Sequence, residues 1–196
     1  MLAYTFTDWI VNIDQQLFIF LNGLHCAFLD PVMVFLSKIG VWIPLYVGIT
    51  FFIFWKRNWK IGLLTALGVI LTFALTDALG VHLFKNVIER PRPCHEASLQ
   101  SVIHLLEGCG GQFSFISNHA ANTFGLAMFT SLFFCRKWYS IVIFSWAAIV
   151  SYSRIYVGKH YPFDIICGAA FGLLVGYSVF MLYQYAKRKL ITESRT

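Results

Sequence analysis

The sequence predicts an all-α integral membrane protein, built as a helical bundle of five or six transmembrane helices. Of its 196 residues, 58% are hydrophobic and only 12% are charged, whereas soluble domains average about 45–50% apolar and about 25% charged residues. The mean hydropathy is +0.68. Several apolar runs approach the roughly 20 residues that a helix needs to cross a bilayer. The lipid bilayer is therefore the first partner that the composition predicts.

Two helices are expected near the N-terminus, and neither has the length of a clear membrane span. Residues 8–22 carry an apolar face, and the Asn22-Gly23 pair that follows is a turn signal. A shorter helix is expected at about 29–39, because Asp30-Pro31 is a typical helix start. The sequence leaves open whether one of them crosses the bilayer or both lie at its surface. The residues before them do not resemble a cleaved signal peptide, since no positively charged segment precedes an apolar run.

Five plainer spans follow, and the basic residues between them predict the orientation. We expect spans at about 41–55, 61–84, 119–135, 138–157 and 163–186. The connections at one end of these spans are basic, with Lys56, Arg57, Lys60, Arg136, Lys137, Lys187, Arg188 and Lys189. Basic residues in short loops stay in the cytoplasm, so residues 85–118 and 158–162 are predicted to lie outside, in the periplasm of a bacterial inner membrane. The formal charge of +6 sits in short clusters without a continuous basic stripe, so nucleic acid is not an expected partner.

The outer ends of the spans also carry positive charge, against this trend. The residues are Lys85, Arg90, Arg92, Arg154 and Lys159. A single basic side chain at a membrane edge usually extends toward water for its own solvation. Several of them on one face are better explained by a bound anion.

The stretch from Ser153 to Asp164 places an Arg, a His and an Asp between two strongly apolar segments. Polar groups at that depth are costly and usually mark a functional site. Pro162 fits the first position of a new helix, which puts Asp164 in its first turn, within reach of His160. A carboxylate on one imidazole nitrogen fixes the tautomer and leaves the other nitrogen to attack. The alternative for this stretch alone is an interfacial ion pair.

Two other stretches converge on the same face by topology. Pro91 disfavours helix at the residue before it, so the helix ends there and Arg92 can fold back near Lys85. Ser117 is a good N-cap, and the backbone N–H groups of the helix that begins there form an anion cradle next to His119. With Arg154, whose planar guanidinium suits an oxyanion, these groups predict a phosphate site.

At these residues the sequence resembles the type 2 phosphatidic acid phosphatase family, whose active site is shared with bacterial acid phosphatases and vanadium haloperoxidases. The first motif of that family, Lys, six residues and Arg-Pro, is present from Lys85 to Arg92-Pro93. The third, Ser-Arg, five residues, His, three residues and Asp, is intact from Ser153 to Asp164. The second, usually Pro-Ser-Gly-His, stands as Ile116-Ser117-Asn118-His119. Asn118 in place of Gly alters how closely the backbone can approach phosphate.

The resemblance implies a role for each matching residue. His160 would attack phosphorus and form a phosphohistidine, held in its reactive tautomer by Asp164, and His119 would protonate the leaving oxygen. The phosphoryl oxygens would be held by the cations and donors Lys85, Arg92, Arg154, Ser117 and Asn118. Three fixed cations neutralise the charge of a transferring phosphoryl group, so no metal and no other cofactor is expected.

The connection at about 86–117 is the one sizeable external loop of a single domain over residues 1–196. In an oxidising compartment Cys94 and Cys109 are expected to form a disulfide, and two free thiols are the alternative. A metal site from these cysteines with His95 and His104 has spacings that fit no familiar zinc pattern.

Two further polar residues carry expectations. Asp77 lies within an apolar span, so it should face the bundle interior and have a partner, either a His or Arg of the site or a Ser, Thr or Tyr. Glu89 and Arg90 are expected to pair with each other at the surface.

The depth of the site predicts a membrane lipid phosphatase whose substrate is a phosphate or diphosphate on a phospholipid, an isoprenoid or lipid A. The candidates are undecaprenyl diphosphate, phosphatidylglycerol phosphate and lipid A, and we favour lipid A or undecaprenyl diphosphate. A lipid phosphotransferase with the same intermediate and a non-catalytic anion-binding or transport protein are the alternatives. The sequence does not indicate an oligomeric state.

Overall fold

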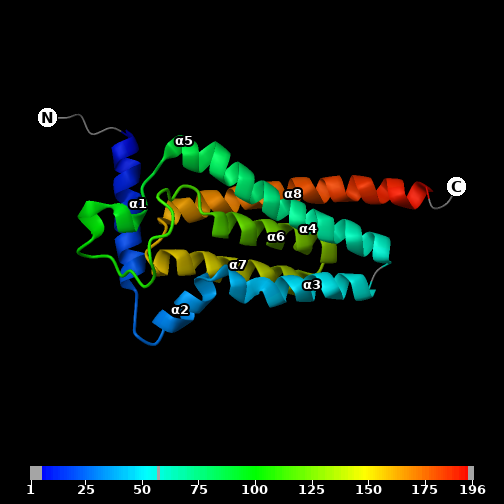
Figure 1. The fold of residues 1–196 in the computed structure, drawn as a ribbon, viewed down its shortest axis with the longest axis horizontal. Coiled ribbons are helices and arrows are strands. Elements are labelled where there is room, and N and C mark those ends of the chain that lie inside the picture. Colours follow the sequence, from blue (N-terminus) through cyan, green and yellow to red (C-terminus); the bar gives the residue numbers. More distant parts are fainter. Residues whose placement is uncertain (1–5, 57, 194–196) are drawn as a thin grey trace.

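The computed structural model describes residues 6–56 and 58–193, and this part of the chain is all-helical (Figure 1). The helices in chain order are α1 (Phe6–Gly23), α2 (Asp30–Ser37), α3 (Ile43–Lys56), α4 (Trp59–Leu79), α5 (Asn86–Ile88), α6 (Asn118–Phe134), α7 (Lys137–Tyr156) and α8 (Pro162–Glu193). Short 3-10 turns cover Ile39–Trp42, Pro93–His95 and Ala97–Leu99. No strand is present among these residues; Pro91 and Phe113 form an isolated antiparallel bridge.

The helices α3, α4, α6, α7 and α8 run side by side along the molecule, and α1 lies across one end of them (Figure 1). The central helix is α6, which packs against α4, α7 and α8. Three helical segments are long and apolar enough to cross a membrane: Ile39–Lys56, Trp59–Ile88 and Pro162–Leu190. The all-helical class predicted from the sequence is therefore confirmed.

Small residues let α8 lie unusually close to α6. A Cβ atom at Gly172 would collide with the backbone of Ala121, and one at Gly176 would collide with the backbone of Gly125. Close backbone approach through small residues is the usual way in which membrane helices pack, because lipid supplies no hydrophobic force between them. Nearer the start of both helices, the backbone N–H of Ser117 donates to the carbonyl of Asp164 at 3.0 Å, which places the first turn of α8 beside the start of α6, where the predicted site residues lie.

The second long helix continues further than the sequence predicts. The expected span ends at 84, but a π-helical turn over Gly80–Lys85 leads directly into α5, so the helical segment reaches Ile88. The external loop then runs from Glu89 to Ser117. Together with α1 it covers one end of the bundle through a cluster of buried side chains, Phe18, Leu99, Ile155 and Tyr161.

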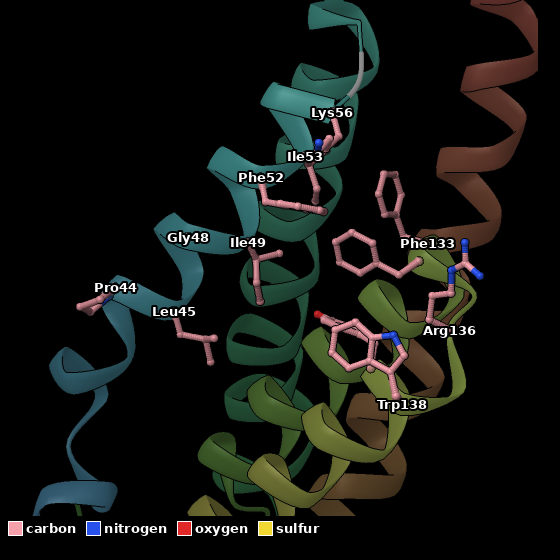
Figure 2. A pocket seen from close by; sticks show the side chains of 12 residues that line it. Pro44, Leu45, Gly48, Ile49, Phe52, Ile53, Lys56, Phe133, Arg136 and Trp138 are labelled. Atoms are coloured by element: carbon pink, nitrogen blue, oxygen red, sulfur yellow. The ribbon is translucent and has the colours of Figure 1, made fainter.

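At the other end of the bundle α3 stands partly apart from its neighbours. Ile53 is the one buried residue of this helix, and a groove lies between α3 and the turn that joins α6 to α7 (Figure 2). The two ends of the molecule therefore differ. One end is covered by α1 and the external loop, and the other has an apolar groove beside α3.

Candidate active site

His160 lies in the short turn between α7 and α8, at the end of the bundle that α1 covers. Its side chain is 2% exposed, and its Nδ1 atom is 3.4 Å from Oδ2 of Asp164. Asp164 lies in the first turn of α8 because Pro162 begins that helix. Oδ2 of Asp164 also accepts a hydrogen bond from the backbone N–H of Tyr161 at 2.9 Å. The carboxylate thus lies beside Nδ1 of the imidazole, and Nε2 lies on the other side of the ring.

The three predicted cations lie close enough to this histidine for their charges to act on its pKa. Burial is the main cause that lowers the pKa of His160 well below its ordinary value of 6.5. The positive charges of Arg154, Arg92 and Lys85 lower this pKa further. Burial disfavours the charged imidazolium and nearby cations repel it, so His160 is neutral near pH 7. A neutral imidazole among fixed positive charges is suited to attack an anionic centre.

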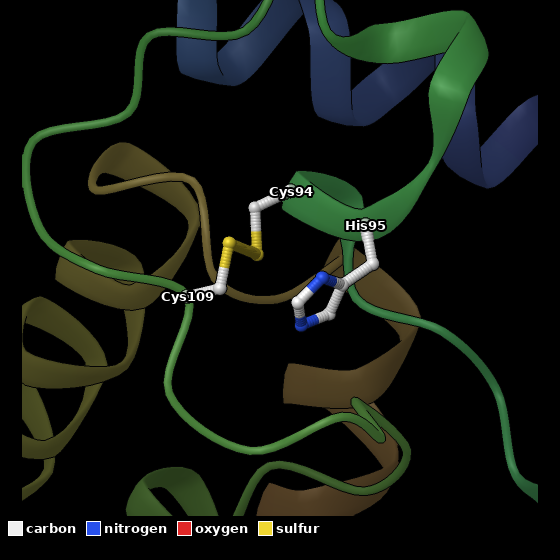
Figure 3. Close-up of side chains that lie close together, drawn as sticks. All are labelled: Cys94, His95 and Cys109. Carbon is white, nitrogen blue, oxygen red and sulfur yellow. A yellow bond between two sulfur atoms is a disulfide. The ribbon is translucent and has the colours of Figure 1, made fainter.

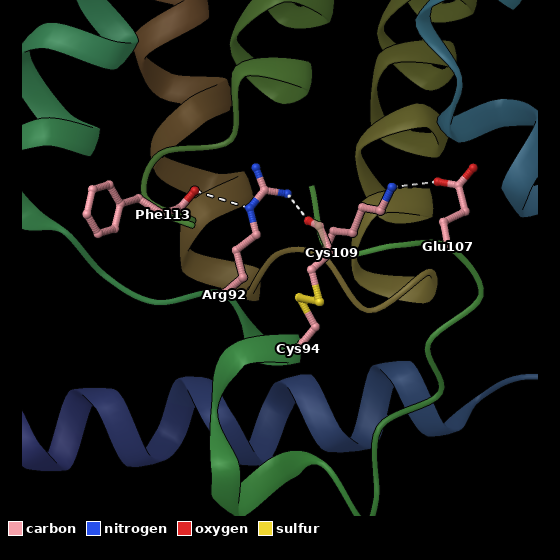
Figure 4. Close-up of a disulfide and its surroundings, with 6 residues drawn as sticks. Arg92, Cys94, Glu107, Cys109 and Phe113 are labelled. Carbon is pink, nitrogen blue, oxygen red and sulfur yellow. Dashed lines mark hydrogen bonds and ion pairs between the residues drawn. A yellow bond between two sulfur atoms is a disulfide. The ribbon is translucent and has the colours of Figure 1, made fainter. Parts of the chain in front are cut away.

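Arg92 is held by the external loop (Figure 4). Its Nε donates to the carbonyl of Phe113 at 3.2 Å, and its Nη1 donates to the carbonyl of Cys109 at 3.1 Å. The side chain is 8% exposed. Because Cys109 is bonded to Cys94, the disulfide holds one of the two carbonyls that orient this guanidinium.

The disulfide joins Cys94 and Cys109, whose Cα atoms are 5.9 Å apart. His95 lies next to it, so these three side chains are close enough to hold an ion (Figure 3). Both sulfur atoms are used in the disulfide. His104 is elsewhere, stacked on His25 with ring centroids 3.7 Å apart. The four residues considered for a metal therefore do not gather at one point.

Reduction of this disulfide should destabilise the protein by about 3 kcal/mol, the value expected for a closed loop of roughly 15 residues, and should lower activity because Arg92 loses an ordered acceptor. Thermal unfolding and phosphate release with and without a reductant measure both effects. Cys26→Ser is the control, since Cys26 is an exposed free thiol. An unchanged unfolding midpoint in the reduced protein would contradict this structural role.

Arg154 and His119 meet at the end of α2, a contact that the sequence did not reveal. Nη1 of Arg154 donates to the backbone carbonyl of Ser37 at 3.2 Å and also contacts the Ser37 hydroxyl. Nε2 of His119 lies 3.2 Å from the same carbonyl. Nε of Arg154 is buried and has no hydrogen-bond partner among the described residues. The Ser37 carbonyl thus lies between the two side chains predicted to bind and to protonate a phosphate ester.

Arg90 joins the site instead of pairing with Glu89, so that prediction is wrong. Its Nη1 atom lies 2.6 Å from Oδ2 of Asp14 and 3.1 Å from Oδ1 of Asp164, and its guanidinium stacks on the ring of Tyr161. Glu89 is exposed, with a left-handed backbone at the end of α5. A surface pair was predicted from adjacency alone. The buried carboxylates offer the stronger partner because they need a compensating charge.

Asp14 was missed by sequence reasoning, although a signal was present. It is 0% exposed in α1, and its Oδ1 accepts a hydrogen bond from the backbone N–H of Phe163 at 2.9 Å. An acidic residue within the apolar pattern of residues 8–22 is unusual and could have marked it. Arg90 links Asp14 to Asp164, whose other carboxylate oxygen lies beside His160.

Asp14→Asn should lower kcat roughly tenfold, because Arg90 then loses its stronger partner and shifts Asp164. It should also lower the free energy of unfolding by about 3 kcal/mol, because a buried ion pair is broken. Phosphate release and thermal unfolding of the purified variant measure the two effects. The matched control is Glu89→Gln, which removes the same charge beside Arg90 from an exposed position. Equal effects of the two variants would contradict the assignment.

The N-terminus of α6 carries the remaining predicted residues. The Ser117 hydroxyl caps the helix by accepting from the backbone N–H of Ala120 at 3.5 Å. The side chain of Asn118 turns away and donates to Oδ1 of Asp77 at 2.9 Å. Nδ2 of Asn122 donates to the same oxygen at 3.1 Å. Asn118 can therefore offer the site its backbone N–H, as a glycine would.

Asp77 differs from its expected position. It is exposed instead of buried in the bundle interior, and its partners are Asn118 and Asn122, neither of which was considered. The predicted Ser, Thr, Tyr, His and Arg partners make no hydrogen bond with Asp77 among the described residues. Its role is to tie α4 to α6 beside the site.

The fold and site together define a membrane phosphatase. A buried neutral imidazole beside a carboxylate, a second histidine, three cations and a helix N-terminus lie at one end of an apolar helical bundle. These groups can supply a nucleophile and the positive charge that stabilises phosphoryl transfer.

Comparison with known proteins identifies the family. The model of the PAP2 superfamily matches residues 59–188, and the chain belongs to that superfamily. A lipid A 4'-phosphatase of Porphyromonas gingivalis is 36% identical over 188 residues, covering 95% of this chain and 80% of that protein. An undecaprenyl-diphosphatase of Sulfolobus acidocaldarius is 34% identical over 170 residues, covering 85% and 77%. The crystal structure of a PAP2-type phosphatidylglycerolphosphate phosphatase from Bacillus subtilis has a TM-score of 0.73 and 25% identity, covering 95% of this chain and 90% of that one.

Proposed function

We propose that this lipid phosphatase removes a phosphate group from lipid A, as a 4'-phosphatase, through a phosphohistidine on His160. The arrangement of His160 and Asp164 among three cations is the observation that carries the reaction class. The lipid A substrate is supported by the 36% identity to the Porphyromonas gingivalis enzyme across 95% of this chain. Undecaprenyl diphosphate is the second candidate, supported by the 34% identical Sulfolobus acidocaldarius relative.

In the first step, Nε2 of His160 attacks phosphorus while the bond from phosphorus to the lipid oxygen breaks. Asp164 holds Nδ1 and stabilises the charge that develops on the ring. His119 donates its proton to the leaving lipid oxygen, which departs as an alcohol. In the second step, His119 takes a proton from water, the water oxygen attacks the phosphohistidine, and phosphate and neutral His160 are released.

Lys85, Arg92 and Arg154 hold the three non-bridging phosphoryl oxygens, with the Ser117 hydroxyl and the backbone N–H of Asn118. These groups neutralise the charge spread over those oxygens in the transition state. Nε of Arg154 has no hydrogen-bond partner in the part of the chain that the structure describes, which leaves this donor for the substrate. A phosphoryl oxygen replaces the carbonyl of Ser37 as the acceptor for Arg154, so the end of α2 moves when substrate binds.

The topology follows from the two ends of the bundle. We propose that α3, α4, α6, α7 and α8 cross the bacterial inner membrane, and that α1 and α2 lie at its periplasmic surface. The disulfide supports an oxidising environment at the site end, and the basic connections support a cytoplasmic location for the other. Residues 1–196 act as one domain, since Asp14 and Ser37 from the first two helices complete the site.

Two native cysteines test this orientation. Cys26 is exposed in the connection between α1 and α2, and Cys135 is exposed at the end of α6. A membrane-impermeant maleimide applied to spheroplasts should label Cys26, and should label Cys135 only after the membrane is permeabilised. Labelling of Cys135 in intact spheroplasts would overturn the orientation.

The substrate is tested with purified protein and a panel of lipids. Lipid A, undecaprenyl diphosphate and phosphatidylglycerol phosphate are presented in the same detergent, and phosphate release is compared as kcat/KM. Lipid A is expected to give the highest value, with the 4'-phosphate lost first. A higher value for either other lipid would reassign the substrate. If the phosphate group of the substrate is labelled and the label appears on a second lipid, with no free phosphate released, the protein is a lipid phosphotransferase.

A further inference from the structure

A second binding site lies at the end of the bundle away from His160. The groove between α3 and the α6–α7 turn has a volume of about 690 Å³ (Figure 2). Its walls are apolar and aromatic, with Ile49 and Phe52 on α3 facing Phe133 and Phe134 on α6. None of the described residues that line it carries a carboxylate. The reaction proposed above makes no use of this part of the molecule.

Two cations stand on opposite walls of this groove. Lys56 is the last residue of α3, and Arg136 lies in the turn between α6 and α7. Both side chains are exposed, and no salt bridge within the described residues includes either of them. Two cations at the mouth of an apolar groove are complementary to a ligand with an anionic head and an apolar body.

The depth of the groove mouth identifies the class of ligand. Trp55, Trp59 and Trp138 are 70%, 64% and 67% exposed, and exposed tryptophans mark the headgroup level of a membrane. Lys56 and Arg136 stand beside two of them. Cations at this level attract anionic lipids, and the aromatic walls extend from there into the apolar part of the bundle.

We propose that the groove binds one anionic phospholipid from the leaflet at the basic end of the bundle. The phosphate lies between Lys56 and Arg136, and an acyl chain lies along Phe52, Phe133 and Phe134. This lipid fills the space that separates α3 from α6, so it fastens a helix of which only Ile53 is otherwise buried. Because the lipid binds the folded chain, it also raises the thermal stability of the protein.

The direct test is quenching of tryptophan fluorescence by lipids with brominated acyl chains. Purified protein in a neutral detergent is titrated with brominated phosphatidylglycerol or with brominated phosphatidylcholine of identical chains. Phosphatidylglycerol is expected to quench at a lower mole fraction, and Trp138→Phe should remove most of the change because Trp138 lines the groove. Equal quenching by the two lipids would overturn the proposal.

Charge variants test the headgroup contact. The double variant Lys56→Gln, Arg136→Gln should weaken phosphatidylglycerol binding roughly 30-fold, since each cation near a lipid surface contributes about fivefold. The matched control is Lys60→Gln, Lys189→Gln, which removes two positive charges from the same end of the bundle but outside the groove. The proposal would be overturned if the Lys56→Gln, Arg136→Gln variant still bound phosphatidylglycerol as the wild type does, or if the control variant lost as much affinity.

Gly48 provides a second variant that leaves both cations in place. It lines the groove, and a Cβ atom built there meets no other atom within 4 Å, so Gly48→Leu should fold and extend into the groove. We expect it to lose phosphatidylglycerol binding and the accompanying rise in unfolding midpoint. Unchanged lipid binding in Gly48→Leu would overturn the proposal. If lipid instead has no effect on the wild-type protein, and Gly48→Leu disrupts a dimer of it, the proposal is also overturned and the groove is assigned to a second copy of the chain.

Discussion

His160→Ala should abolish phosphate release, lowering kcat by roughly 10⁵-fold or more, as expected when a covalent nucleophile is removed. The second histidine of the site cannot replace it, because Nε2 of His119 is directed toward the Ser37 carbonyl. The variant should nevertheless fold. Asp164 keeps its contacts with Arg90 and with the backbone N–H of Tyr161, so the carboxylate is not left as an unpaired buried charge.

The measurement combines turnover with trapping of the intermediate. Wild-type protein quenched during turnover of a labelled substrate should carry an acid-labile phosphoryl group, and His160→Ala should carry none. His25→Ala is the control, because His25 is an exposed histidine stacked on His104 outside the site. A labelled phosphoprotein in His160→Ala would place the nucleophile on another residue.

Much of this site could be predicted from the sequence because its parts are local patterns. The pairing of His160 with Asp164 needs only Pro162 and one helical turn. Lys85, Arg92 and Arg154 could be predicted to lie near one another, because successive spans run in opposite directions and all three residues then fall at the same end. The positions of the long helices could also be predicted, because a long apolar run indicates a helix without any knowledge of its neighbours.

The parts that could not be predicted depend on contacts between distant segments. Asp14 and Asp164 are brought to Arg90 by the way α1 lies across the bundle, which no periodicity in the sequence encodes. The position of Ser37 beside Arg154 depends on a short helix whose depth the sequence left open. Asp77 was misplaced because an acidic residue in an apolar span was assumed to face inward, whereas the Asn118 and Asn122 amides satisfy it at the exposed edge of α4.

The helical segment Trp59–Ile88 shows a third feature that the sequence did not predict. The expected span ends at 84, where apolar residues give way to Lys85 and Asn86. The π-helical turn over Gly80–Lys85 carries the helix through this polar stretch, so the positively charged end of the first motif stays on a rigid element. The backbone of Lys85 is thus part of a helical turn, and the phosphate binding that we propose for Lys85 gains from any freedom that the residue does not have to lose.

His119→Ala should lower kcat by roughly 10²–10⁴-fold with a lipid substrate, the usual contribution of a general acid. The loss should be much smaller for the first step with p-nitrophenyl phosphate, because nitrophenolate is a stable leaving group that needs no proton. Release of nitrophenol in a single turnover therefore separates this role from that of His160.

The second step gives a further distinction between the two histidines. Hydrolysis of the phosphohistidine still requires a proton to be taken from water, so His119→Ala should accumulate the acid-labile phosphoprotein that His160→Ala lacks. Asn122→Ala serves as the control, since it changes a polar residue on the same helix that contacts Asp77 and has no part in the proposed chemistry. Equal losses with the lipid and the nitrophenyl ester would show that His119 positions the substrate through the Ser37 end of α2, because a general acid must act more strongly on the poorer leaving group.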